Sequence, residues 1–145
     1  MADKSTQSMN DFLNYALRNV APSWGSGAQL YISLHVGSPS VGGDQTTNEL
    51  DYVGYARLPI ARNSSGSFSA AVGGSITNTV AFTFGKCTAA GVIPVPHQAI
   101  YIAIGENGSG AGTVLFFTQL AGVGITININ SKPEVPIGAL ILQEA

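Results

Sequence analysis

The stretch Leu30-Tyr-Ile-Ser-Leu-His-Val36 decides the fold class, because apolar and polar side chains alternate along it one by one. A period of two is typical of a half-buried strand in an antiparallel sheet, with one face on the core and the other in solvent. The expected core face carries Leu30, Ile32, Leu34 and Val36, and the expected solvent face carries Tyr31, Ser33 and His35.

Similar stretches recur along the chain, and each predicts another strand. Besides 30–36, the expected strands are 52–61, 67–72, 76–84, 100–104, 113–120, 125–130 and 137–142. About eight strands separated by turn signals are typical of an antiparallel β-sandwich, such as a jelly roll. We therefore expect an all-β fold, with residues 10–145 forming a single domain.

The expected strand at 113–120 breaks the alternation, because both of its faces begin apolar. Two interpretations are open. The strand is either central, with a helix covering its second face, or its outer face meets another subunit.

A short amphipathic helix is expected before the first strand. Ser8 precedes Asp11 by three positions, as in a capping box, and Pro22 ends the helical pattern. The apolar face consists of Leu13, Ala16, Leu17 and Val20. Because a helix of about three turns is marginal in isolation, we expect residues 10–20 to dock on their own domain or on a neighbouring subunit. Residues 1–9 are expected to form a flexible polar arm.

Charged residues are few. They make up 10% of the 145 residues, with six Lys and Arg against eight Asp and Glu, whereas soluble proteins average roughly 25%. So few cations argue against nucleic-acid binding, and no apolar run approaches the ~18 residues that cross a bilayer. The start lacks an apolar secretion signal and Cys87 is the only cysteine, so we expect synthesis in a reducing cytoplasm. A surface poor in charge indicates an assembled protein.

Residues with metal-binding potential do not form a known motif. His35 and His97 lack nearby zinc ligands, and we expect both at the surface or at an interface. Asp44, Glu49 and Asp51 lie close together in sequence and could bind calcium. They lack the spacing of an EF-hand loop, so a solvated loop is the favoured interpretation.

The sequence also contains few candidate catalytic residues. Glu106 lies in a glycine-rich turn that lacks the Lys-Ser/Thr end of a phosphate loop. Cys87 has no evident histidine partner and is expected to be a buried structural thiol. The serines lie in loops without a paired base. We therefore predict no catalytic residue, no metal, no cofactor and no enzymatic activity.

Three positions carry local structural predictions. Gly54 would allow a bulge or a close backbone approach. Gly73-Gly74, between two expected strands, predicts a tight hairpin turn with positive φ. Arg57 is expected to form a surface ion pair with Glu49 or Asp51, worth roughly 0–1 kcal/mol.

The order of several segments resembles that of a phage protein family. The segments are Leu30-Tyr-Ile-Ser-Leu-His35, Gly54-Tyr-Ala-Arg57, His97-Gln-Ala-Ile-Tyr-Ile-Ala-Ile104 and Gly112-Thr-Val-Leu-Phe-Phe-Thr-Gln-Leu120. In this order they are similar to small virion proteins of tailed bacteriophages, described as tail-fibre-like or capsid decoration (cement) proteins. The resemblance covers residues 10–145 and implies a β-sandwich virion component. It departs from the family pattern after His35, where Val-Gly-Ser-Pro stands in place of Thr-Ala-Asp-Pro, and in the proline-rich insert 91–96.

Two functions are compatible with these features. The favoured one is a capsid cement protein, made in the host cytoplasm, that binds the major capsid protein on the outer surface of the head as a homotrimer. Because large apolar and aromatic side chains dominate interface energetics, its expected anchors are Tyr52, Tyr55, Leu115 and Phe117, each of which also suits a core. The alternative is a tail-fibre or tail-tip module that binds host surface glycans, with candidate contacts at Tyr31, Tyr101, Asn128 and Asn130. Neither function involves nucleic acid or a membrane.

Overall fold

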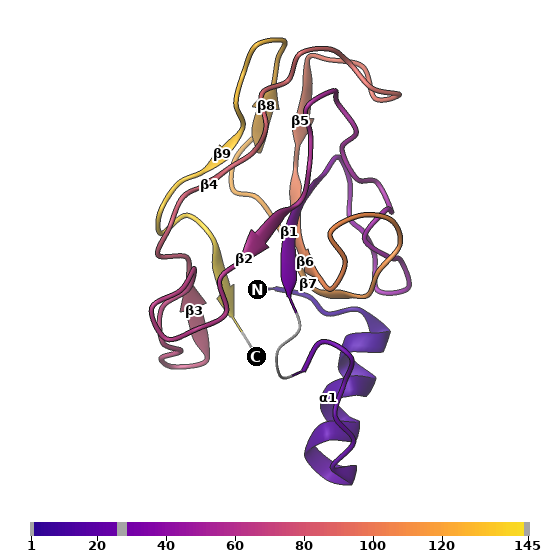
Figure 1. The fold of residues 1–145 in the computed structure, drawn as a ribbon, viewed down its shortest axis with the longest axis vertical. Helices are drawn as coiled ribbons and strands as arrows, with labels where there is room; N and C mark the ends of the chain where they lie inside the picture. Colours follow the sequence, from indigo (N-terminus) through magenta and orange to yellow (C-terminus); the bar gives the residue numbers. More distant parts are fainter. Residues whose placement is uncertain (1, 26–28, 144–145) are drawn as a thin grey trace.

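The structure, a computed structural model, describes residues 2–25 and 29–143, which form one helix and a set of short strands (Figure 1). The elements are α1 (Thr6–Arg18), β1 (Leu30–His35), β2 (Leu58–Ile60), β3 (Ser75–Thr77), β4 (Phe82–Thr83), β5 (His97–Ala99), β6 (Tyr101–Gly105), β7 (Val114–Gln119), β8 (Ile125–Ile127), β9 (Glu134–Val135) and β10 (Ile141–Gln143). Apart from α1 the fold is all-β, as predicted. Residue 1 of the expected arm and residues 26–28 and 144–145 of the expected domain lie outside the described residues, and the single domain stays a prediction.

A four-stranded antiparallel sheet in the order β2-β1-β6-β7 forms the centre of the fold. β1 and β6 pair over five residues, from Tyr31 opposite Gly105 to His35 opposite Tyr101. The other strands pair two by two, as β3-β10, β4-β9 and β5-β8. Three short ribbons thus stand where a sandwich would have a second continuous sheet, and the jelly-roll topology stays a prediction.

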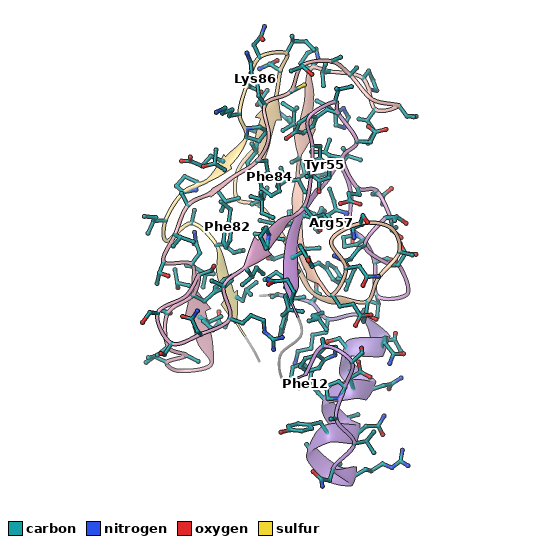
Figure 2. All side chains as sticks on the ribbon, in the orientation of Figure 1. Phe12, Tyr55, Arg57, Phe82, Phe84 and Lys86 are labelled. Atoms are coloured by element: carbon teal, nitrogen blue, oxygen red, sulfur yellow. The ribbon has the colours of Figure 1, made fainter. Side chains whose placement is uncertain are left out.

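The main core lies between one face of the four-stranded sheet and the ribbons, where Figure 2 shows Phe82 and Phe84. Its buried members include Ile32, Leu34, Ile102 and Ile104 from the sheet, and Phe82, Phe84, Ile127, Val135, Leu140 and Leu142 from the ribbons and the segments beside them. Full burial of each large apolar side chain stabilises the fold by roughly 1.5–3 kcal/mol. This core is therefore the main source of stability. Among the described residues, no helix has both the length and the apolar character needed to span a membrane.

The second face of β1 is also buried, which contradicts its predicted exposure. Ser33 and His35 have no accessible surface, because the segment 36–50 folds back over them. That segment is tied down by the Leu50 N–H, which donates to the Leu34 carbonyl at 3.0 Å. The predicted surface position of His35 is therefore wrong: the alternation marks a polar face, and a polar loop covers that face.

The expected strand at 76–84 is interrupted by Asn78. The buried Asn78 amide donates to the carbonyls of Val80 and Pro136, both at 2.8 Å, and its Oδ1 accepts from the Leu140 N–H at 2.9 Å. β3 therefore ends at Thr77 and β4 begins at Phe82, with the bonded Asn78 between them. The expected strand at 67–72 contributes only isolated bridges among the described residues, at Phe68 and at Val72.

Both glycine predictions are confirmed. Gly73 and Gly74 have φ values of 59° and 76°, and the backbone groups of Val72 and Ser75 exchange two hydrogen bonds across them. This is the two-residue hairpin that requires positive φ at both central positions. Gly54 has φ of 101°, and a Cβ there would lie 2.1 Å from the carbonyl oxygen of Lys86, so it permits a close backbone approach.

The broken alternation in β7 arises from a bulge. The pairing with β6 shifts register between Phe116 and Val114, so that Leu115 is the extra residue. As a result Val114 and Phe117, three residues apart, share one small core. The bulge accounts for the sequence pattern. β7 is the last strand in the order of the sheet, so its expected central position is wrong, although α1 does contact β7, through Phe12 against Phe116.

α1 begins at Thr6, four residues earlier than expected. Its N-cap is Ser5, whose Oγ accepts from the Ser8 N–H at 3.1 Å, so the prediction of Ser8 as the cap is wrong. Before the helix, the backbone of Asp3 exchanges two hydrogen bonds of 2.8 Å with Phe117 on β7. The boundary expected at residue 9, between an arm and the domain, therefore does not occur there: residues 6–9 are helical.

Candidate interaction surface

α1 projects from one end of the β-structure (Figure 1), and its apolar side chains largely face solvent. We call Met9, Leu13, Ala16 and Leu17 the α1 stripe; Met9, Leu13 and Leu17 are 42%, 59% and 80% exposed. Val20, just beyond the helix, is 50% exposed. Docking on the chain's own domain, one of the two expected outcomes, therefore does not cover this face.

The first half of α1 is held by aromatic contacts. The ring of Phe12, labelled in Figure 2, lies 4.9 Å from that of Trp24 and 6.3 Å from that of Phe116 on β7. Trp24 Nε1 donates to Asp11 Oδ2 at 2.8 Å, and Lys4 Nζ lies 4.5 Å above the Phe12 ring. These contacts fix the direction of α1 and leave the α1 stripe uncovered.

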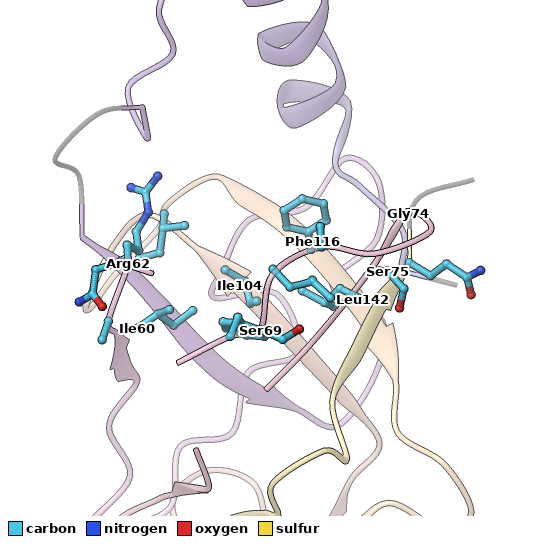
Figure 3. A pocket seen from close by; sticks show the side chains of 16 residues that line it. Ile60, Arg62, Ser69, Gly74, Ser75, Ile104, Phe116 and Leu142 are labelled. Carbon is cyan, nitrogen blue, oxygen red and sulfur yellow. The ribbon is translucent and has the colours of Figure 1, made fainter. Parts of the chain in front are cut away.

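An apolar recess of about 420 Å³ opens at the same end of the molecule as α1 (Figure 3). Its lining includes Phe68, Ile76, Ile104 and Leu142, together with Phe116, which also contacts α1. An apolar lining of this kind suits binding of an apolar surface and supplies no acid–base pair.

Arg57 and Glu49 form the predicted ion pair, but in a buried position. Arg57 Nη2 and Nε donate to Glu49 Oε2 and Oε1 at 2.6 and 2.7 Å, and the side chains are only 3% and 13% exposed. Arg57 Nη1 donates to the Asn107 carbonyl at 2.8 Å. Although burial alone lowers the pKa of Arg57, the hydrogen bonds and charge of Glu49 outweigh it and raise that pKa. The pair thus joins three segments of the chain.

Tyr55 completes this arrangement. Its hydroxyl donates to Glu49 Oε1 at 2.9 Å and accepts from the Leu34 N–H at 3.0 Å. Burial, together with the negative charge of Glu49, raises the pKa of Tyr55. Figure 2 shows Tyr55 and Arg57 near the middle of the molecule. The group holds a loop onto β1, a structural role.

The structure brings together one pair with catalytic potential that the sequence analysis missed. Ser33 Oγ lies 2.9 Å from His35 Nε2, and His35 Nδ1 lies 2.9 Å from the Thr47 carbonyl. Residues two apart on a strand share a face, so the spacing was a usable signal. Both side chains are fully buried, and burial lowers the pKa of His35. A substrate would have to displace the covering segment to reach them.

The acidic residues of the loop before Tyr52 point to different partners. Asp44 Oδ1 accepts from the Thr46 N–H and hydroxyl, Glu49 binds Arg57, and Asp51 accepts from the backbone N–H groups of Val92 and Ile93. Within the described ranges, no group of three His, Cys, Asp or Glu side chains could hold a metal ion. The carboxylates therefore tie loops together.

The four predicted interface anchors lie inside the chain. Tyr52, Leu115 and Phe117 are buried and Tyr55 is half-buried. The Tyr52 hydroxyl donates to the Gly85 carbonyl at 2.9 Å, and burial raises its pKa to about 12. Contact of these residues with a partner stays a prediction, which their burial does not support.

The candidate glycan contacts do not converge. Tyr31 lies at one end of β1, beside Glu106 and Asn107, while Tyr101 pairs with the opposite end of the same strand. Asn128 and Asn130 are exposed beyond β8. The hydrogen bond from Ser23 and those from Thr113 outweigh the effect of burial and lower the pKa of Glu106. The four residues thus do not form one site.

Comparison with known families places these observations in context. A family model described as Podophage GP4 fiber I protein gp80 matches residues 3–143, nearly the whole chain. No curated protein matches the chain. The match confirms the predicted resemblance to virion proteins of tailed bacteriophages.

Proposed function

Since the chain belongs to the family of the podophage GP4 fiber I protein gp80, a family of structural virion proteins, we propose that it is a building block of a tail fibre. It works by binding other virion proteins and carries out no chemical step.

The exposed α1 stripe is the observation that carries this proposal. Complete burial of a large apolar side chain stabilises a contact by roughly 1.5–3 kcal/mol, so Leu13 and Leu17, at 59% and 80% exposure, can each contribute about 1–2 kcal/mol. A row of such side chains on a projecting helix marks a protein–protein contact. α1 is therefore the attachment surface.

The interior supports a structural role. The Ser33–His35 pair and the Arg57–Glu49 pair are both buried and bonded to loop backbone. Such groups stiffen the β-structure that presents α1. The apolar recess adjoining α1 adds surface of the same character.

The family description favours the fibre over the cement interpretation to which the sequence first pointed. Binding to the major capsid protein, a place on the outer surface of the head and a homotrimer stay predictions. Glycan binding through Tyr31, Tyr101, Asn128 and Asn130 has no support, because these residues do not form one site.

Imaging of the virion tests the proposal. Antibody fragments against this chain, added to purified particles, are expected to label the tail, and the chain is expected at a small fraction of the copy number of the major capsid protein. Label spread over the head, with copy numbers comparable to that of the capsid protein, would instead establish the cement function and overturn the fibre assignment.

A further inference from the structure

We propose that the α1 stripe is the surface through which copies of this chain associate with one another, helix against helix. The inference rests on the proposed function of a fibre component and names the partner of α1 within it.

The spacing of the stripe is the first argument. Met9, Leu13 and Ala16 follow one another at intervals of four and three residues, the spacing of the apolar seam in helical bundles, and Leu17 widens the seam. The small side chain of Ala16 lets a second helix approach closely. Because an identical helix presents the same seam, the stripe is complementary to itself.

Charge is the second argument. The two charged residues of α1, Asp11 and Arg18, lie off the stripe. Asp11 accepts from Trp24 Nε1, and Arg18 Nη1 donates to Asn14 Oδ1 at 3.0 Å. Two copies can therefore bring their stripes together without placing like charges face to face. The α1 stripe offers no charged group that could pair with a strongly charged partner, whereas the stripe of a second copy is equally apolar.

The position of α1 is the third argument. Phe12, at the middle of the helix, packs on Phe116 of β7, and the end of α1 near Arg18 extends past the strands (Figure 1). Helices from several copies can therefore meet before their β-structures do. A 13-residue helix is marginal without packing, so association along the stripe would also stabilise its outer half.

The test is the mass of the full chain in solution, measured by light scattering after size-exclusion chromatography over a range of concentrations. The parent chain is expected to form oligomers. A variant with Leu13→Asn and Leu17→Asn is expected to elute at the monomer mass of 14.9 kDa. Leu13→Ile with Leu17→Met, which keeps the stripe apolar, is expected to restore the oligomer.

Val92→Asn is the matched control. Val92 is 94% exposed and lies outside α1, so this change is expected to leave the oligomer intact. Circular dichroism checks that every variant is folded, and Leu17→Asn alone serves if the double variant is not. A monomeric parent, or an oligomer that persists in the Leu17→Asn variant, overturns the inference. Neither result affects the fibre assignment, which depends on where the chain lies on the virion.

Discussion

Replacement of Glu49 by Gln is expected to destabilise the fold by about 3–5 kcal/mol, the range for breaking a buried ion pair from one side. The change removes the charge that receives two short hydrogen bonds from Arg57, at 2.6 and 2.7 Å. The guanidinium would then face neutral acceptors, the Asn107 carbonyl and the amide oxygen of the substituted side chain, while still being almost fully buried. Because a domain of this kind is stable by about 5–15 kcal/mol in total, the loss is a large fraction.

Urea unfolding followed by circular dichroism measures this effect directly. In thermal unfolding of a chain of this length, the same loss of 3 kcal/mol corresponds to a decrease in Tm of roughly 6–12 °C. Glu134→Gln is the matched control, because Glu134 is exposed and bonds only a threonine hydroxyl in the described structure; its expected change is within about 0.5 kcal/mol. If Glu49→Gln unfolded at the same urea concentration as Glu134→Gln, the buried pair would not contribute as argued.

A double-mutant cycle separates the pair from its surroundings. Arg57→Met alone leaves the Glu49 carboxylate buried with the Tyr55 hydroxyl, and the double variant leaves no unpaired charge. The double variant is therefore expected to lose less stability than the sum of the two single variants, by at least 1 kcal/mol. Additive losses would show that the two side chains act independently.

Three further predictions concern the fold. Gly54→Ala is expected to lower stability by at least about 1–3 kcal/mol in thermal unfolding, because its φ of 101° and the nearby carbonyl leave no room for a Cβ; Gly42→Ala, where a Cβ meets nothing within 4 Å, is expected to be neutral, and equal Tm values would refute the packing argument. Asn78→Ala is expected to cost about 1–3 kcal/mol in urea unfolding, since it leaves the N–H of the buried Leu140 unpaired, while Asn128→Ala at an exposed position is expected to cost little; similar costs would refute the role of the amide. Burial lowers the pKa of His35, so below about pH 6.5 the unfolded chain binds a proton that the folded chain excludes, and the fold becomes less stable as the pH is lowered. His35→Gln is expected to flatten this dependence in urea midpoints measured between pH 5 and 8, and an unchanged slope would contradict it.

The alternation around Leu30–His35 predicts the central strand correctly because strand pairing follows a local pattern. It does not predict the burial of His35, because that depends on the segment 36–50 folding back over the strand. In the same way the run 76–84 has the pattern of one strand, but the Asn78 amide bonds to Pro136, far away in sequence. Local sequence patterns determine which segments form strands, whereas contacts with segments distant in sequence determine which faces of those strands are buried.

The candidate surface could be predicted in part. The apolar helical positions Leu13 and Leu17 are visible in the sequence, as is the need of so short a helix for a partner. Their exposure depends on the direction of α1, which is set by the packing of Phe12 on Phe116, about a hundred residues away. That a side chain is large and apolar does not by itself tell whether it lies in the core or at an interface, as the burial of Leu115 shows.

Hydroxyl-radical footprinting of purified virions tests the central claim, that the chain acts through α1 as a virion component, most directly. In the free chain at low concentration, the exposed Met9, Leu13 and Leu17 are each expected to be oxidised, and their rates there are the reference for the same residues in the virion. In the virion the three helix residues are expected to be protected, while Val92 serves as the internal reference. Unchanged oxidation of the helix, with protection at another surface, would contradict the account.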